Sequence, residues 1–137
     1  MKNKMNNTPN QINNMKQKDF GYDTDPYTGF IRGNMFSGLY DPYKNYKPQE
    51  LNPANEKESA LFLVQMYDFA AHDLSLYLDT NPNDANAINL RNKYINMYKQ
   101  ALAEYESRYG ALTQDSQMLE TKPWAWNTKK WPWEGTR

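Results

Sequence analysis

Residues 60–78, ALFLVQMYDFAAHDLSLYL, decide the fold of this chain, because their apolar side chains nearly encircle a helix. A first stripe at helical spacing contains Ala60, Leu63, Val64, Tyr67, Ala70, Ala71, Leu74, Tyr77 and Leu78. A second stripe contains Phe62, Met66, Phe69 and Leu76 and is interrupted by Asp73. A helix that is apolar on most sides must be covered on most sides. We therefore expect the first stripe to pack on another helix, and the second stripe to pack on a flanking segment or another chain.

The boundaries of this helix are indicated by the residues on either side of it. Asn52 followed by Pro53 is typical of a helix cap and the first helical position, so the sequence predicts a helix over residues 53–78. The stretch DTNP at residues 79–82 ends it, because the residue before a proline avoids helical geometry.

A second helix is predicted over residues 82–109, with apolar residues on one face. Asn81 with Asp84 three residues later resembles a capping box, and Gly110 is the usual residue after a helix end. The short connection makes the two helices an antiparallel hairpin. Because two helices enclose little volume, either the flanking segments fold over the hairpin or two hairpins associate as a four-helix bundle.

The flanking sequences complete an all-α organisation in three parts. Residues 1–18 have the composition of a disordered arm, and residues 19–52 form an irregular segment rich in Gly, Pro and aromatic residues, with a short helical turn near residues 34–39. Residues 53–137 contain the hairpin and a Trp-rich tail.

The tail holds four tryptophans in two W-x-W pairs, each next to a proline: Trp124, Trp126, Trp131 and Trp133. We expect an extended backbone there, with the two indoles of each pair facing opposite ways. Indoles at this density rarely stay in water. They pack on the hairpin or on a second subunit, or they form a patch for a partner protein or a platform for stacking on sugars.

Composition excludes several classes of function. Lysines and arginines number 16 and acidic residues 16, so no basic field attracts nucleic acid or an anionic membrane. The chain has no cysteine, which excludes disulfides and thiolate sites. We expect no membrane span, because residues 60–78 contain Asp68, His72 and Asp73, and no secretory signal, because the N-terminal lysines precede no apolar core.

No catalytic constellation is visible, so we expect no enzyme activity and no cofactor. His72 is the single histidine, which excludes a metal site with two histidines within one chain. Asp68 lies four residues before it on the same helical face, so a metal site would require two copies of the chain. Gly-rich phosphate loops and the motifs HExxH and GxSxG are absent.

Three segments together resemble the CotJB family of bacterial spore coat proteins: DFAAHDLSLYLDT (residues 68–80), YESRYGALT (105–113) and WAWNTKKWPWE (124–134). The resemblance covers about residues 59–134. This sequence has Asn81 where the family often has histidine and Ala111 where it often has proline, both at turn positions. Upstream, GNMFSGLYDPY (residues 33–43) resembles the end of a companion coat protein, CotJA.

The resemblance implies a structural or assembly protein made in the mother cell cytoplasm and deposited in the inner spore coat. Its implied partners are other coat proteins, among them a manganese-catalase-like protein and a CotJA-like protein, with a homodimer as a further option. The candidate partner-binding residues are the second stripe and the tail tryptophans: Phe62, Met66, Phe69, Leu76, Trp124, Trp126, Trp131 and Trp133.

Two alternatives to a coat protein remain. LDTNPNDANA (residues 78–87) before a Tyr-rich helix is similar to a helix junction of tetratricopeptide adaptors, although such arrays need about three repeats and this chain has one hairpin. The other alternative is a metal-binding dimer that uses Asp68 and His72.

Overall fold

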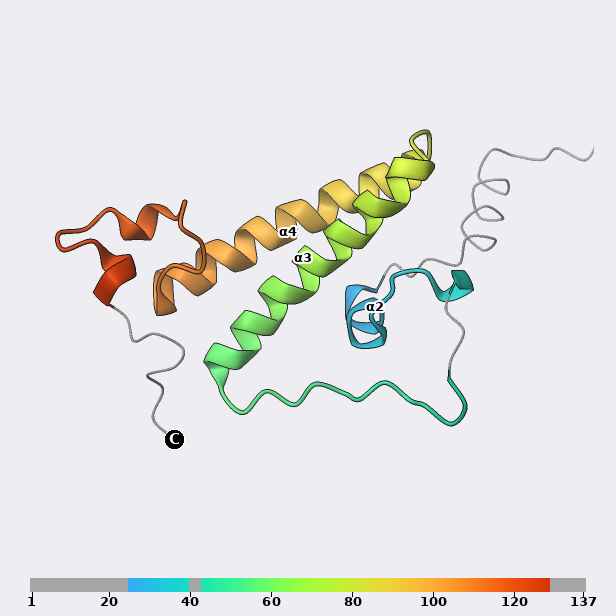
Figure 1. Ribbon diagram of the computed structural model, residues 1–137, viewed down its shortest axis with the longest axis horizontal. Helices are drawn as coiled ribbons and strands as arrows, with labels where there is room; N and C mark the ends of the chain where they lie inside the picture. Colours follow the sequence, from blue (N-terminus) through green and yellow to red (C-terminus); the bar gives the residue numbers. More distant parts are fainter. Residues whose placement is uncertain (1–24, 40–42, 129–137) are drawn as a thin grey trace, which may run out of the picture.

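The computed structural model describes residues 25–39 and 43–128, and this part of the chain is helical, without strands. The elements are α2 (Pro26–Arg32), the 3₁₀ turn η1 (Ser37–Leu39), α3 (Glu56–Thr80), α4 (Ala85–Tyr109) and the 3₁₀ turns η2 (Gln117–Leu119) and η3 (Ala125–Thr128). Figure 1 shows α3 between α4 on one side and α2 on the other. The predicted all-α hairpin is confirmed. Among the described helices, none has the length and apolar character needed to cross a membrane.

Helix α3 begins at a reciprocal cap. The Oδ1 atom of Asn55 accepts a hydrogen bond from the backbone N–H of Glu58 at 2.9 Å, and the Glu58 carboxylate accepts one from the N–H of Ala54 at 2.7 Å. The predicted cap at Asn52 was therefore wrong by three residues. Asn55 prevails because it has a glutamate three residues later that completes the capping box.

The connection between α3 and α4 uses Asn81 and Asp84 differently from the prediction. Asn81 caps the end of α3, because its backbone N–H and its side-chain amide both donate to the carbonyl of Tyr77 at 3.1 Å. Asp84, not Asn81, is the N-cap of α4, and it accepts from the N–H groups of Asn86 and Ala87. Its second oxygen accepts from the Tyr77 hydroxyl at 3.0 Å. One carboxylate thus starts α4 and joins it to α3.

The buried core joins α3 to both of its neighbours. It consists of Met35, Phe36, Ala70, Ala71, Leu74, Tyr77, Ala87 and Tyr94. On the α4 side, the rings of Tyr67 and Tyr94 stack with their centres 6.3 Å apart. The first stripe therefore packs on α4, except that Leu63 is exposed in a groove of about 250 Å³ that Ala60 and Ala101 also line. The small alanine side chains leave the space around Leu63 unfilled.

The N-terminal segment contains a helix that the sequence analysis did not anticipate. Asp25 caps α2 by accepting from the N–H groups of Tyr27 and Thr28, both at 3.2 Å, and Pro26 occupies the first turn. Asp25-Pro26 indicated a break in the chain, but the same pair is also a favourable helix start. Gly33 ends α2 in the left-handed conformation with φ 79°. The expected turn near residues 34–39 is present as η1.

Candidate protein interaction surface

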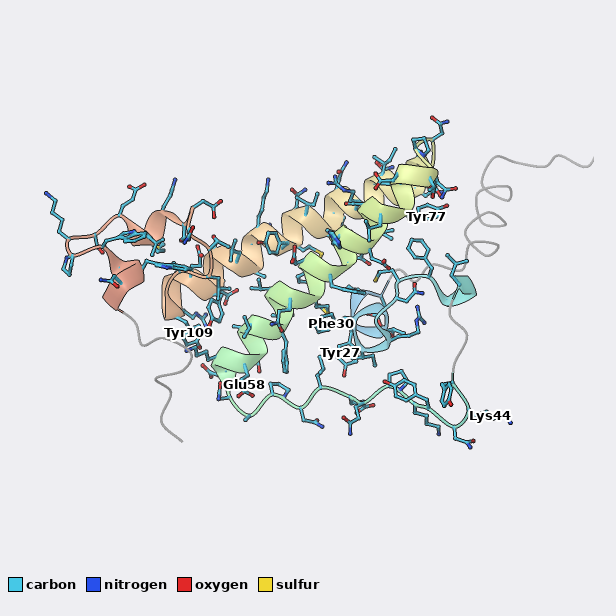
Figure 2. All side chains as sticks on the ribbon, viewed as in Figure 1. Tyr27, Phe30, Lys44, Glu58, Tyr77 and Tyr109 are labelled. Atoms are coloured by element: carbon cyan, nitrogen blue, oxygen red, sulfur yellow. The ribbon has the colours of Figure 1, made fainter. Side chains whose placement is uncertain are left out.

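The second stripe of α3 is partly covered by α2. The rings of Phe30 and Phe69 meet edge to face with their centres 5.7 Å apart, and Met66 is buried. Phe30 and its neighbour Tyr27 can be followed on α2 in Figure 2. The partner expected for this stripe was an N-terminal segment, the tail or another chain. In the described residues, Phe69 is covered by the N-terminal segment of the same chain.

The two residues Met35 and Phe36, just after α2, are more completely buried than most residues of α2. Met35 is 0% exposed and Phe36 is 4% exposed. The Phe36 ring stacks on Tyr77 with centres 4.7 Å apart. The backbone N–H of Met35 donates to the carboxylate of Asp73 at 2.8 Å, so the polar residue that interrupts the second stripe pairs with a main-chain donor that burial would otherwise leave unsatisfied.

The approach of Met35 requires a glycine on α2. A Cβ atom added at Gly29 would overlap the sulfur of Met35 and would lie 3.2 Å from its Cα atom. Arg32 fixes the backbone that leads into Met35, because its guanidinium donates to the carbonyl of Asn34 at 2.7 and 2.9 Å. The side chain of Asn34 in turn accepts from the N–H of Phe36 at 2.7 Å. These local hydrogen bonds therefore hold residues 32–36 in the conformation that packs on α3.

Some of the candidate partner-binding residues stay accessible. Leu76 on α3 is 54% exposed and Trp124 in the tail is 53% exposed. Phe62 and Trp126 are half-buried. The remaining candidates, Trp131 and Trp133, lie outside the described residues, as does the predicted arm of residues 1–18.

The tail folds back on the end of α4. Glu106 accepts from the N–H of Leu112 at 2.8 Å and from the hydroxyl of Ser116 at 2.7 Å. Leu119 in η2 is buried. Trp126 lies in the 3₁₀ turn η3, so the backbone of the first W-x-W pair is not extended as expected. The part of the tail around Trp124 lines a hollow of about 420 Å³.

The polar side chains of α3 that the sequence offered as candidate metal ligands are Asp68 and His72. Asp68 and His72 are both exposed. Burial raises the pKa of Tyr98 on α4, and the negative charge of Asp68 adds to this shift. Within residues 25–39 and 43–128, no three acidic, histidine or cysteine side chains gather as a metal site would require.

The sequence predicted that the aromatic N-terminal segment, which contains Met35 and Phe36, lies against a helical surface, but it did not indicate that these two residues meet the region of Asp73. Asp73 was visible as the one polar interruption of the second stripe, and Asn34, Met35 and Phe36 lie in the segment rich in Gly, Pro and aromatic residues. Their pairing could not be predicted, because the two segments are far apart in the sequence and no helical periodicity relates them.

Comparison with known proteins identifies the region that contains the hairpin. Residues 58–134, more than half of the 137-residue chain, match the model of a protein family described as CotJB protein. No curated protein and no solved structure matches the chain. The match begins just inside α3, so α2 and η1 lie outside it.

Proposed function

The chain belongs to the CotJB family of spore coat proteins, and from this premise we propose that it is a non-enzymatic assembly component that binds other coat proteins through aromatic and apolar surfaces. The observation that carries the proposal is the exposure of Leu76 and Trp124 within the family region. Exposed apolar side chains that lie together mark surfaces that meet other proteins, and tryptophan is among the residues that contribute most to such binding.

The second stripe and the tail tryptophans supply the binding residues in this proposal. Phe69 contacts the N-terminal segment and Met66 is buried, whereas Leu76, Phe62 and Trp124 have surface left for a partner. The proposed partners are a manganese-catalase-like coat protein and a CotJA-like protein. The protein is made in the mother cell cytoplasm and is then deposited in the inner coat.

The absence of net charge fits such a role. With 16 basic and 16 acidic residues, the chain is poorly protected from association with itself and with other proteins. This favours incorporation into a dense protein layer over free diffusion. A metal-binding dimer built on Asp68 and His72 has less support, because both side chains are exposed and no third ligand lies with them in the described residues.

The proposal is tested by following the tagged protein into purified spores. Leu76→Asp combined with Trp124→Ala should reduce its recovery in the coat fraction and its capture of the catalase-like protein. Leu63→Asp is the matched control, because Leu63 is also exposed on α3 but lies in the groove beside α4. Full recovery of the double variant, or absence of the unmodified protein from the coat fraction, would overturn the proposal.

A further inference from the structure

Residues 25–39, here called the strap, form a separable part of the fold. Among the contacts that join the strap to α3 are the ring of Phe30 on Phe69, the N–H of Met35 on Asp73, and the ring of Phe36 on Tyr77. The strap side of each contact lies outside the family region, and the α3 side lies inside it. The family region, residues 58–134, therefore carries a face of α3 that a covalently attached peptide covers in this chain. We call this face, defined by Phe69, Asp73 and Tyr77, the α3 groove.

The attachment is a linker with little structure of its own. Between η1 and α3, residues 43–55 contain neither helix nor strand, and their side chains are mostly exposed. Figure 1 shows this linker running along the lower side of the view until it reaches the start of α3. A tight turn is closed by the bond from the N–H of Tyr46 to the carbonyl of Tyr43 at 3.0 Å, and the Tyr27 hydroxyl accepts from the N–H of Leu51 at 3.2 Å. Few contacts oppose a change in the path of the linker.

The length of the linker allows the strap to reach more than one groove. Phe36 sits at Tyr77, which lies about 32 Å along α3 from Glu56 at a rise of 1.5 Å per residue. The chain between Leu39, the last residue of the strap, and Glu56 can extend to roughly 56 Å at about 3.3 Å per residue. This length is more than one and a half times the path along its own α3.

Exposed apolar residues gather at this linker. Leu39 is 69% exposed, Tyr43 is 85% exposed and Tyr46 is 54% exposed. Within the described residues each of these side chains is more than half exposed, although large apolar residues normally gain by leaving water. Two linkers that run side by side would cover both sets.

From these observations we propose that the strap of one copy fills the α3 groove of a second copy. Two chains then exchange straps, retain the contacts of the strap with α3, and bury the exposed residues of their linkers against each other. The contacts in the groove are the same in both forms, so concentration decides between them. A flexible linker of this length gives an effective local concentration on the order of 1 mM, so exchange prevails near or above that value, or lower if the linker contact is strong. The inference does not depend on the proposed coat function.

Complementation between two variants of the full chain tests the exchange. Phe36→Ser damages the strap, and Asp73→Lys damages the groove because lysine cannot accept from the N–H of Met35. Each variant alone has only damaged interfaces. Mixed, the strap of the Asp73→Lys chain fills the groove of the Phe36→Ser chain and restores one intact interface per pair. Light scattering coupled to size exclusion should therefore show at least tenfold more dimer in the mixture than in either variant alone.

A second pair of substitutions tests the linker contact without touching the groove. Tyr43→Ser with Tyr46→Ser should weaken dimerisation of the otherwise unmodified chain at least tenfold and leave the thermal unfolding of the monomer unchanged. A chain that stays monomeric at 1 mM would overturn the proposal. So would a mixture that forms no more dimer than its components, because dimerisation would then use another surface.

Discussion

Replacing Met35 by alanine should destabilise the protein more than any other methionine substitution in the described residues. Met35 is completely buried between α2 and α3, and loss of a buried methionine side chain costs about 2–5 kcal/mol through lost burial and the cavity that remains. The strap can detach from α3 while the hairpin persists, so the loss is limited to the free energy with which the strap docks. We therefore expect a decrease of about 2–3 kcal/mol in the free energy of unfolding.

Two assays measure this effect. Urea unfolding followed by circular dichroism gives the change in unfolding free energy. Tryptic cleavage after Arg32, a half-buried residue in α2, reports detachment of the strap. A loss of about 2 kcal/mol corresponds to cleavage that is about 30-fold faster, because each 1.4 kcal/mol is a factor of ten. Met118→Ala is the matched control, since Met118 is 49% exposed and its loss should cost less than about 1 kcal/mol.

Equal effects of the two substitutions would refute the reasoning. If Met35→Ala changed neither the unfolding free energy nor the cleavage rate, Met35 would not be packed against α3 in solution.

The remaining predictions concern the strap and the tail. Gly29→Ala should lower the thermal unfolding midpoint, although alanine normally stabilises a helix by about 1 kcal/mol relative to glycine, because the added Cβ overlaps Met35; a raised midpoint would argue against this contact. The hydrogen bond from the Thr28 hydroxyl, together with those from backbone N–H groups, lowers the pKa of Asp25. The stability that the Asp25 carboxylate gives to α2 is therefore complete above the ordinary pKa of about 3.9 for an aspartate, and it is lost as the pH falls through the lower pKa of the folded state. Cleavage of the strap by pepsin should therefore accelerate below about pH 4 in the native chain and much less in Asp25→Asn. Glu106→Gln should shift tryptophan emission to the red by loosening the tail, whereas Glu104→Gln, which breaks only an exposed ion pair, should leave the emission unchanged.

The hairpin could be predicted from sequence because its signals are local and repeated. Apolar spacing located α3 and α4, and Gly110 marked the end of α4 at Tyr109. The helix starts were less predictable because several Asn and Asp residues compete as caps within a few positions. Asn55 prevails over Asn52, and Asp84 prevails over Asn81, through hydrogen bonds that depend on the next turn.

The sequence predicted that the second stripe of α3 is covered, but it did not predict which residues cover it. Too much apolar surface on residues 60–78 indicated that something must lie on the second stripe. That Phe30, Met35 and Phe36 supply the cover follows from long-range packing, which leaves no periodic trace in a segment punctuated by Gly and Pro. The exposure of Leu63 could not be predicted either, because it depends on which side chains α4 places opposite it, Ala101 among them.

Hydrogen exchange at the amide of Met35 in the intact chain tests most directly that the strap covers α3 on the side that α4 leaves open. This amide donates to Asp73, whereas Lys44 lies in the exposed linker and serves as an internal control. A docking free energy of about 2.7 kcal/mol or more predicts exchange at Met35 at least 100-fold slower than in an unstructured peptide, and loss of that protection in Asp73→Lys. Exchange at Met35 as fast as at Lys44 would contradict the account.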